Sequence, residues 1–190
     1  NVKRMLAYSS IAHAGYMLLA MPVMSGESVY AIMVYLVMYL FMNLGAFFVV
    51  ITVKNRTNGE TFDDYKGLGW EMPIVGISMT LFMVSLTGLP PTAGFIGKFY
   101  IFASLIQGGS AFYWLVIIGG INSVISLYYY LRVVKVMYFD GERKDSLLFP
   151  PRVLSGMLLV TAIPTLVLGI YWVPIAEWIQ SSLVFFIQTI

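Results

Sequence analysis

Long stretches without a charged side chain alternate with short charged segments along the chain. Each stretch is at least as long as the ~20 residues that an α-helix needs to cross the hydrocarbon core of a bilayer. Four of these stretches are residues 5–26, 28–53, 72–97 and 153–176. Residues 99–131 are uncharged as well, so we expect them to hold the end of one helix, a turn near 107–111 and most of another helix.

This pattern predicts an all-α integral membrane protein with five transmembrane helices, forming a single transmembrane domain over residues 1–190. The third helix is expected to be discontinuous between Gly88 and Pro91. The residues from Pro174 onward are typical of a short helix, either interfacial or partly inserted. The predicted spans are approximately residues 3–22, 28–53, 72–106, 112–137 and 152–172.

The composition supports a lipid environment. Hydrophobic residues make up 59% of the chain and charged residues 11%, with a mean hydropathy of +0.85, whereas soluble domains carry ~25% charged residues. A soluble core of this size would leave too much apolar surface in water. We therefore expect the chain to contact the lipid bilayer and no nucleic acid.

Few side chains are suited to redox or metal chemistry. The chain has no cysteine and one histidine, which excludes disulfides and thiolate ligands and makes a metal site unexpected. The sequence also lacks paired histidines for a haem and a Gly-x-Gly-x-x-Gly motif after a strand. We therefore expect no catalytic residue, no metal and no cofactor on this chain.

The first residues are NVKRMLAYSS, in which basic residues run directly into an apolar segment. A cleavable signal peptide would instead show a basic region, a short apolar core and a cleavage site of small residues. We therefore expect the sequence to be part of a longer polytopic chain that begins upstream.

Basic residues outside the predicted spans all fall on one side of the membrane. If the five spans alternate in direction, this side carries ten Lys and Arg residues and the opposite side carries none. Cytoplasmic loops are enriched in Lys and Arg, so we expect the basic side to be cytoplasmic and the C-terminus to lie outside. The ten residues are Lys3, Arg4, Lys54, Arg56, Lys66, Arg132, Lys135, Arg143, Lys144 and Arg152.

Polar residues inside three of the spans recur at helical spacing, so those in one span share a face. Two interpretations remain open, because such stripes serve either as hydrogen-bonded contacts between helices or as the lining of a hydrated path. The stripes are Ser9, His13 and Tyr16; Tyr35, Tyr39 and Asn43; and Asn122, Ser126 and Tyr129 or Tyr130.

His13 lies near the middle of the first span. A lone histidine is most often a packing residue with satisfied hydrogen bonds. Inside a membrane, however, a titratable group at mid-depth is a functional candidate, and imidazole can both accept and donate a proton near neutral pH. His13 is therefore a candidate proton relay.

The segment SLTGLPPTAGFIGKFYIF, residues 85–102, interrupts an otherwise apolar span. Pro90 and Pro91 lack the backbone N–H and clash with the preceding turn, which should release the carbonyls of Leu86 and Thr87. Gly88 adds flexibility. Irregular backbone at this depth survives only inside protein or beside a water-filled cavity, and a broken span is the usual sign of an ion site in a transporter.

Lys98 is the only charged residue between Glu71 and Arg132. It follows Pro91 by seven residues, ~10 Å along a helix, and shares a helical face with Gly94. A charge at this depth costs at least ~2.5–3.5 kcal/mol, and snorkelling to the interface is the structural alternative. The helix break together with Lys98 favours a proton-carrying site.

Four segments closely resemble the antiporter-like chain N of bacterial respiratory complex I, the NADH-quinone oxidoreductase. The likeness in order and spacing covers residues 1 to about 138, whereas the last part of the chain resembles that family only in hydropathy. The segments are KRMLAYSSIAHAGYMLLA (3–20), YLFMNLGAF (39–47), SLTGLPPTAGFIGKFYIF (85–102) and SLYYYLRVVKVMY (126–138).

The resemblance implies that these five helices match the final five of chain N and form part of an inverted-repeat, antiporter-like subunit with one broken helix in each repeat. Lys98 then matches the lysine of the second broken helix, and His13 matches the histidine of SSIxH in a central polar axis that carries protons. The matching glutamate and lysines of the first repeat are absent here, so this sequence would supply about half of a proton path.

The resemblance also implies where the rest of the chemistry resides. NADH, FMN, iron–sulfur clusters and quinone would be bound by other subunits, and the partners would be neighbouring antiporter-like and small membrane subunits of the membrane arm. The expected location is the inner membrane of a bacterium, because chloroplast-type relatives tend to have SSIGQAG where this sequence has SSIAHAG.

Two alternatives stay open. Subunits of multi-subunit sodium/proton antiporters, and of membrane-bound hydrogenases, share the general KRxLAYSS and broken-helix pattern. A passive membrane anchor would explain the polar stripes, but it would explain neither Lys98 nor the adjacent prolines.

Thr61 and Asp64, in the connector between the second and third spans, are expected to cap a short helix.

Overall fold

The computed structural model describes residues 1–141 and 147–188, and side chains as far as Leu183. Every regular element in these ranges is helical, which confirms the predicted all-α class. The elements are α1 (Val2–Ala20), η1 (Met21–Val23), α2 (Gly26–Thr57), η2 (Phe62–Tyr65), α3 (Leu68–Glu71), α4 (Pro73–Thr87), α5 (Ala93–Gln107), η3 (Ser110–Phe112), α6 (Tyr113–Phe139), α7 (Arg152–Ile170) and α8 (Val173–Gln188).

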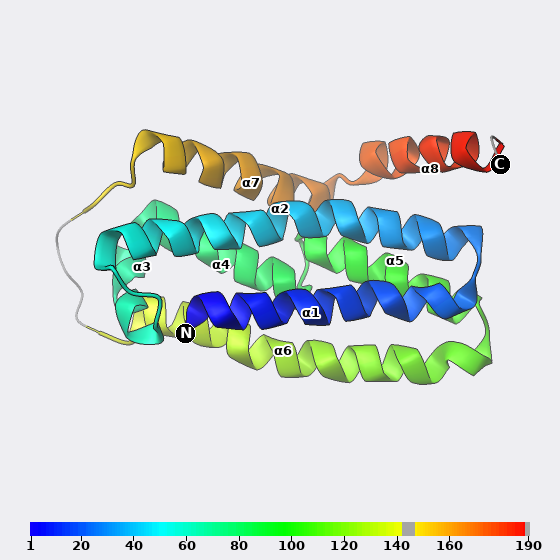
Figure 1. Cartoon of the computed structure of the whole chain (residues 1–190), viewed down its shortest axis with the longest axis horizontal. Helices are drawn as coiled ribbons and strands as arrows, with labels where there is room; N and C mark the ends of the chain where they lie inside the picture. Colours follow the sequence, from blue (N-terminus) through cyan, green and yellow to red (C-terminus); the bar gives the residue numbers. More distant parts are fainter. Residues whose placement is uncertain (142–146, 189–190) are drawn as a thin grey trace.

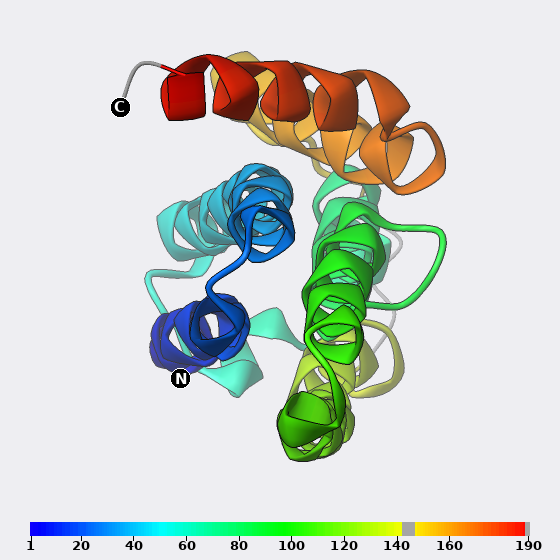
Figure 2. The ribbon, with the colours of Figure 1, turned by 90° about the vertical axis from the view of Figure 1, so that its right-hand side faces the viewer.

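The helices form a bundle along one long axis. Helices α1, α2 and α6 run side by side, and α4 and α5 follow one another along the same direction (Figure 1). Figure 2, viewed from the end of the bundle, shows α1 and α2 on one side, α4, α5 and α6 on the other, and α7 and α8 across one face. Helix α2 packs against α1, α4, α5 and α7, so it is the central element of the bundle.

The outward faces of the bundle carry many exposed apolar side chains. Ile11 on α1 is 68% exposed, Ile117 on α6 is 62% exposed and Val160 on α7 is 67% exposed. A soluble protein rarely exposes apolar patches of this extent. The bundle therefore has the surface of an integral membrane protein, with lipid in place of water around it.

Within the described residues, four helices are long and apolar enough to cross a bilayer: Val2–Val23, Gly26–Thr57, Ser110–Phe139 and Arg152–Ile170. A fifth span is counted when α4 is joined to the preceding Phe62–Glu71 segment, from which it is bent by 118°. Helix α5 is apolar but has only 15 residues.

The connections gather at two ends of the bundle (Figure 1). One end holds the start of α1, the end of α2, the η2–α3 connector, the end of α6 and the start of α7. The other end holds the α1–α2 and α5–α6 turns. The predicted basic residues within the described ranges therefore share one end, which we call the basic end. Arg143 and Lys144 lie outside the described residues.

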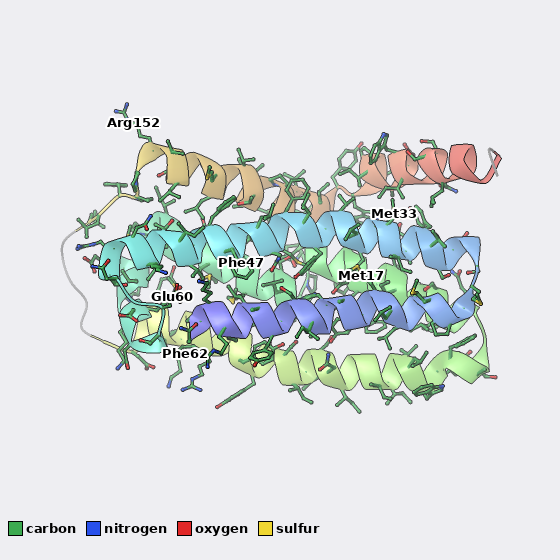
Figure 3. All side chains as sticks on the ribbon, viewed as in Figure 1. Met17, Met33, Phe47, Glu60, Phe62 and Arg152 are labelled. Carbon is green, nitrogen blue, oxygen red and sulfur yellow. The ribbon has the colours of Figure 1, made fainter. Side chains whose placement is uncertain are left out.

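Charged contacts tie the connector to the basic end. The Glu60 carboxylate lies 2.9 Å from the Lys54 ammonium and 3.4 Å from that of Lys3, and Figure 3 shows Glu60 and Phe62 beside the start of α1. The hydroxyl and backbone N–H of Thr61 donate to the Asp64 carboxylate at 2.6 and 2.7 Å. The predicted capping of a short helix by Thr61 and Asp64 is confirmed, because this pair forms the capping box of η2.

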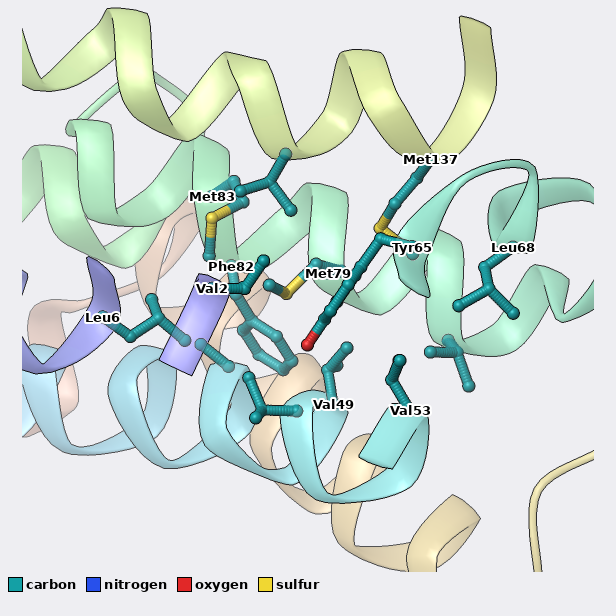
Figure 4. Packing of buried hydrophobic residues seen from close by; sticks show 14 of the residues in the cluster. Val2, Leu6, Val49, Val53, Tyr65, Leu68, Met79, Phe82, Met83 and Met137 are labelled. Atoms are coloured by element: carbon teal, nitrogen blue, oxygen red, sulfur yellow. The ribbon is translucent and has the colours of Figure 1, made fainter. Parts of the chain in front are cut away.

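The largest buried cluster fills the half of the bundle nearest the basic end (Figure 4). Tyr65 of the connector inserts its ring between α2 and α4, close to Val49 and Met79, and Phe82 of α4 packs beside them. Gly45 on α2 leaves the space that the Phe82 ring occupies, since a Cβ there would overlap the ring. This core fixes α4 against α2, and with it the position of the C-terminal end of α4.

Candidate proton-transfer site at the helix break

The site begins where α4 stops. Gly88 follows the last residue of α4 with φ of 87°, a left-handed conformation that glycine adopts without strain. Pro90 and Pro91, joined by a cis peptide bond, have no N–H with which to continue the helical hydrogen bonds. Helix α5 then begins at Ala93, so Gly88 to Thr92 separate two helices that lie end to end.

Small residues hold the two helix ends close together. The Gly94 N–H donates to the Ser85 hydroxyl at 3.1 Å, and a Cβ on Gly94 would overlap the Ser85 carbonyl oxygen. From the other side, Gly169 of α7 allows Pro91 and Thr92 to approach its backbone. Gly94 therefore supports the break by close packing against the end of α4.

Lys98 reaches back from α5 to the end of α4. Its ammonium donates to the Thr87 carbonyl at 2.7 Å and to the Ser123 hydroxyl of α6 at 3.0 Å. The side chain is buried at 5% exposure, and its Cδ lies close to Gly88, within 2.7 Å of where a Cβ would stand. The Thr87 carbonyl, which the sequence predicts to be released by the prolines, is therefore satisfied by Lys98.

Tyr16 of α1 completes the surroundings of Lys98. The Lys98 Nζ lies 4.5 Å from the centroid of the Tyr16 ring, in a cation–π arrangement. The Tyr16 hydroxyl bonds to the Ser123 hydroxyl at 2.8 Å and accepts from the Asn122 amide at 3.3 Å. Among the described residues, the ion pairs link groups near the basic end, and none of them includes Lys98.

His13 forms a second polar centre one turn along α1. It is buried at 1% exposure, with Nδ1 2.6 Å from the Tyr35 hydroxyl and Nε2 3.1 Å from the Tyr130 hydroxyl. The Ser9 hydroxyl also bonds to Tyr130, and the Tyr39 ring stacks on the imidazole with centroids 4.9 Å apart. Because a neutral imidazole donates at one nitrogen and accepts at the other, its two tyrosines take opposite roles.

Tyr16 connects the two centres. Its ring centroid lies 6.0 Å from that of His13, and its hydroxyl belongs to the hydrogen-bonded group around Lys98. Helices α1, α2, α5 and α6 each contribute to the combined site, so a proton-bearing network can form only when the bundle is assembled.

The predicted lining residues fall into distinct environments. Ser9, Tyr16 and Asn122 belong to the hydrogen-bonded network, whereas the Ser126 hydroxyl donates to the Ser123 carbonyl on its own helix at 2.7 Å. The Tyr39 hydroxyl and the Asn43 Oδ1 are buried without a hydrogen-bond partner. Buried polar atoms of this kind are normally satisfied by water, and the Tyr39 ring lies against His13 at the α1–α2 contact.

One contributor, Ser123, was missed by the sequence analysis, and it bonds to both Lys98 and Tyr16. Tyr35 and Tyr130, which belong to the predicted polar stripes, bind the two nitrogens of His13. The positions of Gly119, Ser123 and Tyr130 share one face of α6, and this spacing would have drawn attention to Ser123. Which helix that face meets is not encoded in the spacing.

The described residues contain no group of three or more His, Cys, Asp or Glu side chains able to hold a metal ion. The arrangement can instead hold and transfer protons. The Lys98 amine and the His13 imidazole each bond to hydroxyl groups, which can donate and accept a hydrogen bond, and the Tyr16 ring lies near both of them.

The described residues form a helical membrane bundle in which a buried lysine lies beside a helix break. The sequence profile described as "NADH:quinone oxidoreductase/Mrp antiporter, TM" matches residues 1–126, and the chain belongs to this family. It is 53% identical to NADH-quinone oxidoreductase subunit N 2 of Sorangium cellulosum over 96% of its length, and 46% identical to subunit N of Chlorobium chlorochromatii over 96% of its length. The chain spans 36% of the length of each of these relatives.

Solved structures support the same assignment. The chain superimposes on respiratory complex I from Thermus thermophilus with bound aureothin at a TM-score of 0.74 and 29% identity, covering 92% of this chain and 39% of that one. It also superimposes on an archaeal membrane-bound sulfane sulfur reductase at a TM-score of 0.82 and 28% identity, covering 96% of this chain and 37% of that one. The fold is therefore shared by respiratory membrane complexes of different types.

Proposed function

We propose that this chain is a proton-translocating part of the membrane arm of an NADH-quinone oxidoreductase. The observation that carries the proposal is the buried Lys98, bonded to the freed Thr87 carbonyl at the helix break and to Ser123. The names of the relatives point to the same complex. In this role the chain has no redox centre, and it contributes to the enzyme by moving protons.

Lys98 serves as the proton carrier in this proposal. Its ammonium is stabilised by a carbonyl, a hydroxyl and an aromatic ring, and no carboxylate within the described residues fixes its charge. When the proton leaves, the neutral amine can still donate to Thr87 and accept from Ser123, so deprotonation requires no rearrangement of the helices. Ser123 and Tyr16 offer the next hydroxyl groups along the path.

His13 serves as the relay toward the basic end. One ring nitrogen can accept a proton from a tyrosine hydroxyl while the other donates to the second tyrosine. Tyr130 and Ser9 extend the chain of hydroxyls. The unpartnered Tyr39 hydroxyl and Asn43 carbonyl oxygen support an adjacent hydrated segment.

The topology belongs to the proposal as well. Helices α4 and α5 act together as one discontinuous span, giving five spans, with α8 an interfacial or partly inserted helix after the fifth. The basic end faces the cytoplasm, and the C-terminus lies on the outer side of a bacterial plasma membrane. The residue limits of the predicted spans and their assignment to one domain over residues 1–190 remain predictions.

The partners in this proposal are neighbouring antiporter-like and small membrane subunits of the complex. NADH, FMN, iron–sulfur clusters and quinone reside on other subunits, and the coupling of their chemistry reaches this chain through the membrane arm.

A second candidate function follows from the likeness to the sulfane sulfur reductase. The same helices would then move ions within a membrane complex that has a different electron acceptor. An exchange of sodium for protons, as in multi-subunit antiporters, is the third candidate. Activity with NADH and quinone in the assembled complex separates the first candidate from these two.

The decisive experiment replaces Lys98 in the complete complex, reconstituted in vesicles with a pH-sensitive dye inside. Lys98→Ala should leave the complex assembled and reduce both quinone reductase activity and proton pumping strongly. Lys98→Arg should fail to restore pumping, because arginine does not deprotonate in proteins. Lys66→Ala, which removes an exposed basic residue of the connector, is the matched control and should pump normally. Full pumping by the arginine variant would exclude a titrating role for Lys98.

A further inference from the structure

A groove runs along the outer face of α5 and α6 in two connected parts. The first part has a volume of about 540 Å³ and opens beside Lys98. The second part, of about 690 Å³, lies on α6 nearer the basic end and reaches Arg132 and Lys135. Val124 and Leu127 line both parts, so the groove extends from two exposed cations to the centre of the bundle.

The walls between these ends are apolar. Leu89 at the helix break is 38% exposed, and Val124 and Leu131 of α6 are 69% and 42% exposed. Ser123 is the polar side chain of α6 in the inner part, and its hydroxyl is bonded to Lys98 and Tyr16. The middle of the groove therefore offers contact area to a hydrocarbon chain and few hydrogen bonds to a polar ligand.

The outer end is suited to a phosphate. The Arg132 guanidinium lies 4.8 Å from the centroid of the Phe62 ring, which restricts its position while leaving its N–H donors available. The Lys135 ammonium lies 3.6 Å from the Asp140 carboxylate. Two positive charges therefore face one negative charge, which leaves the outer end with a net positive charge. Arginine binds phosphate oxygens through paired N–H donors.

The length of the groove matches one leaflet of a bilayer. Arg132 and Ser123 are nine residues apart on α6, which is ~13.5 Å at 1.5 Å per residue. Half of a hydrocarbon core of ~30 Å is ~15 Å. A molecule whose phosphate lies at Arg132 and whose chain follows α6 therefore ends near the bilayer centre, beside Ser123 and Lys98.

We propose that this groove binds one anionic glycerophospholipid from the leaflet at the basic end. Its phosphate lies on Arg132 and Lys135, and one acyl chain follows Leu131, Leu127 and Val124 inward. The end of the chain covers the opening beside Lys98 and closes it to the surrounding bilayer. The proposal depends on the bundle crossing a membrane and does not depend on proton translocation.

The test uses the complete complex in nanodiscs of phosphatidylethanolamine containing a small fraction of phosphatidylglycerol with a photoreactive diazirine at the end of one acyl chain. After irradiation, labelled peptides are mapped by mass spectrometry. Labelling should concentrate on residues 95–99 and 123–127, which line the opening beside Lys98. Removal of each charge in Arg132→Gln and Lys135→Gln should reduce this labelling about fivefold, because each basic residue contributes ~1 kcal/mol to binding anionic lipid.

Two further variants make the outcome specific. Leu127→Trp should block labelling of the inner groove while both cations remain, and Arg152→Gln, at the start of α7 near the same end, should leave it unchanged. Equal labelling of the double Arg132→Gln, Lys135→Gln variant would overturn the proposal, because the lipid would then be part of the general annulus. Loss of labelling together with a crosslink from a benzophenone at Val124 to a neighbouring polypeptide would overturn it too, because a protein helix would then occupy the groove.

Discussion

Gly94 provides the sharpest test of how the helix break is built. Its N–H donates to the Ser85 hydroxyl at 3.1 Å, and the space that a side chain would need is occupied by the Ser85 carbonyl oxygen. The obstacle is backbone, so it cannot move aside as a flexible side chain would. Gly94→Ala should therefore push the start of α5 away from the end of α4.

The expected cost is the sum of two effects. Overpacking that shifts backbone typically costs ~1–3 kcal/mol. Loss of the hydrogen bond between Gly94 and Ser85 adds ~0.5–1.5 kcal/mol. Gly94→Ala should thus destabilise the protein by roughly 1.5–4.5 kcal/mol. It should also weaken the contact of Lys98 with Thr87, because Lys98 lies one turn further along the displaced helix.

The assay compares thermal unfolding of the purified complete complex with its proton pumping in vesicles. Gly120→Ala on α6 is the matched control, because no atom lies within 4 Å of the Cβ it would add. The control should be neutral or stabilising by up to ~1 kcal/mol, as for glycine to alanine in a helix. Ser85→Ala removes the hydrogen bond from Gly94, together with the weak one that the Ser85 hydroxyl donates to Met42 Sδ, and leaves the backbone packing in place. Its stability should fall between the two. Equal stability of the Gly94 and Gly120 variants would refute the close packing described for the break.

Four other predictions follow from the site and the connector. A cysteine at Asn58 should resist membrane-impermeant reagents added to intact cells, and ready labelling from outside would reverse the proposed topology. His13→Ala should reduce pumping more than assembly, whereas loss of assembly alone would make His13 a packing residue. Ser123→Ala should slow pumping and destabilise the protein by ~1–3 kcal/mol, since its hydroxyl bonds to both Lys98 and Tyr16 and each hydrogen bond contributes ~0.5–1.5 kcal/mol; unchanged pumping would remove Ser123 from the path. Hydrogen bonding from Lys54 and from Lys3 lowers the pKa of Glu60. The Glu60 carboxylate should therefore contribute its full stabilisation above the ordinary glutamate pKa and lose it as pH falls through the lowered pKa. Glu60→Gln should abolish this contribution to the acid dependence of thermal unfolding, and an unchanged pH profile would contradict the prediction.

The sequence predicts the helices well because the signals are local. Charge-free runs give the length of each apolar helix, and Gly88 with two prolines gives the end of α4. The same reasoning identifies the Thr87 carbonyl as a free acceptor, although it does not reveal that Lys98 satisfies it. A released carbonyl and a nearby amine are both visible in the sequence, but their pairing depends on the direction that α5 takes after the break.

Contacts between helices are less predictable for a related reason. Helical spacing places His13 on the polar face of α1, yet it does not specify that Tyr35 and Tyr130 bind its two nitrogens. Those partners come from α2 and α6, 22 and 117 residues away in the chain. Ser123 was overlooked because a single serine beside Asn122 resembles an ordinary polar residue of a membrane helix until Lys98 is placed against it.

The choice of partners around Lys98 suits a proton carrier better than a fixed charge. A carboxylate within hydrogen-bonding distance would favour the ammonium form and hold the proton in place. The carbonyl of Thr87, the hydroxyl of Ser123 and the ring of Tyr16 stabilise an ammonium through dipoles and a quadrupole, and the first two also accommodate a neutral amine. The helix break supplies this carbonyl, because Thr87 loses its helical hydrogen bond there. The freed carbonyl then accepts a hydrogen bond from Lys98 whether the amine is charged or neutral, so the helix break and the lysine stabilise each other.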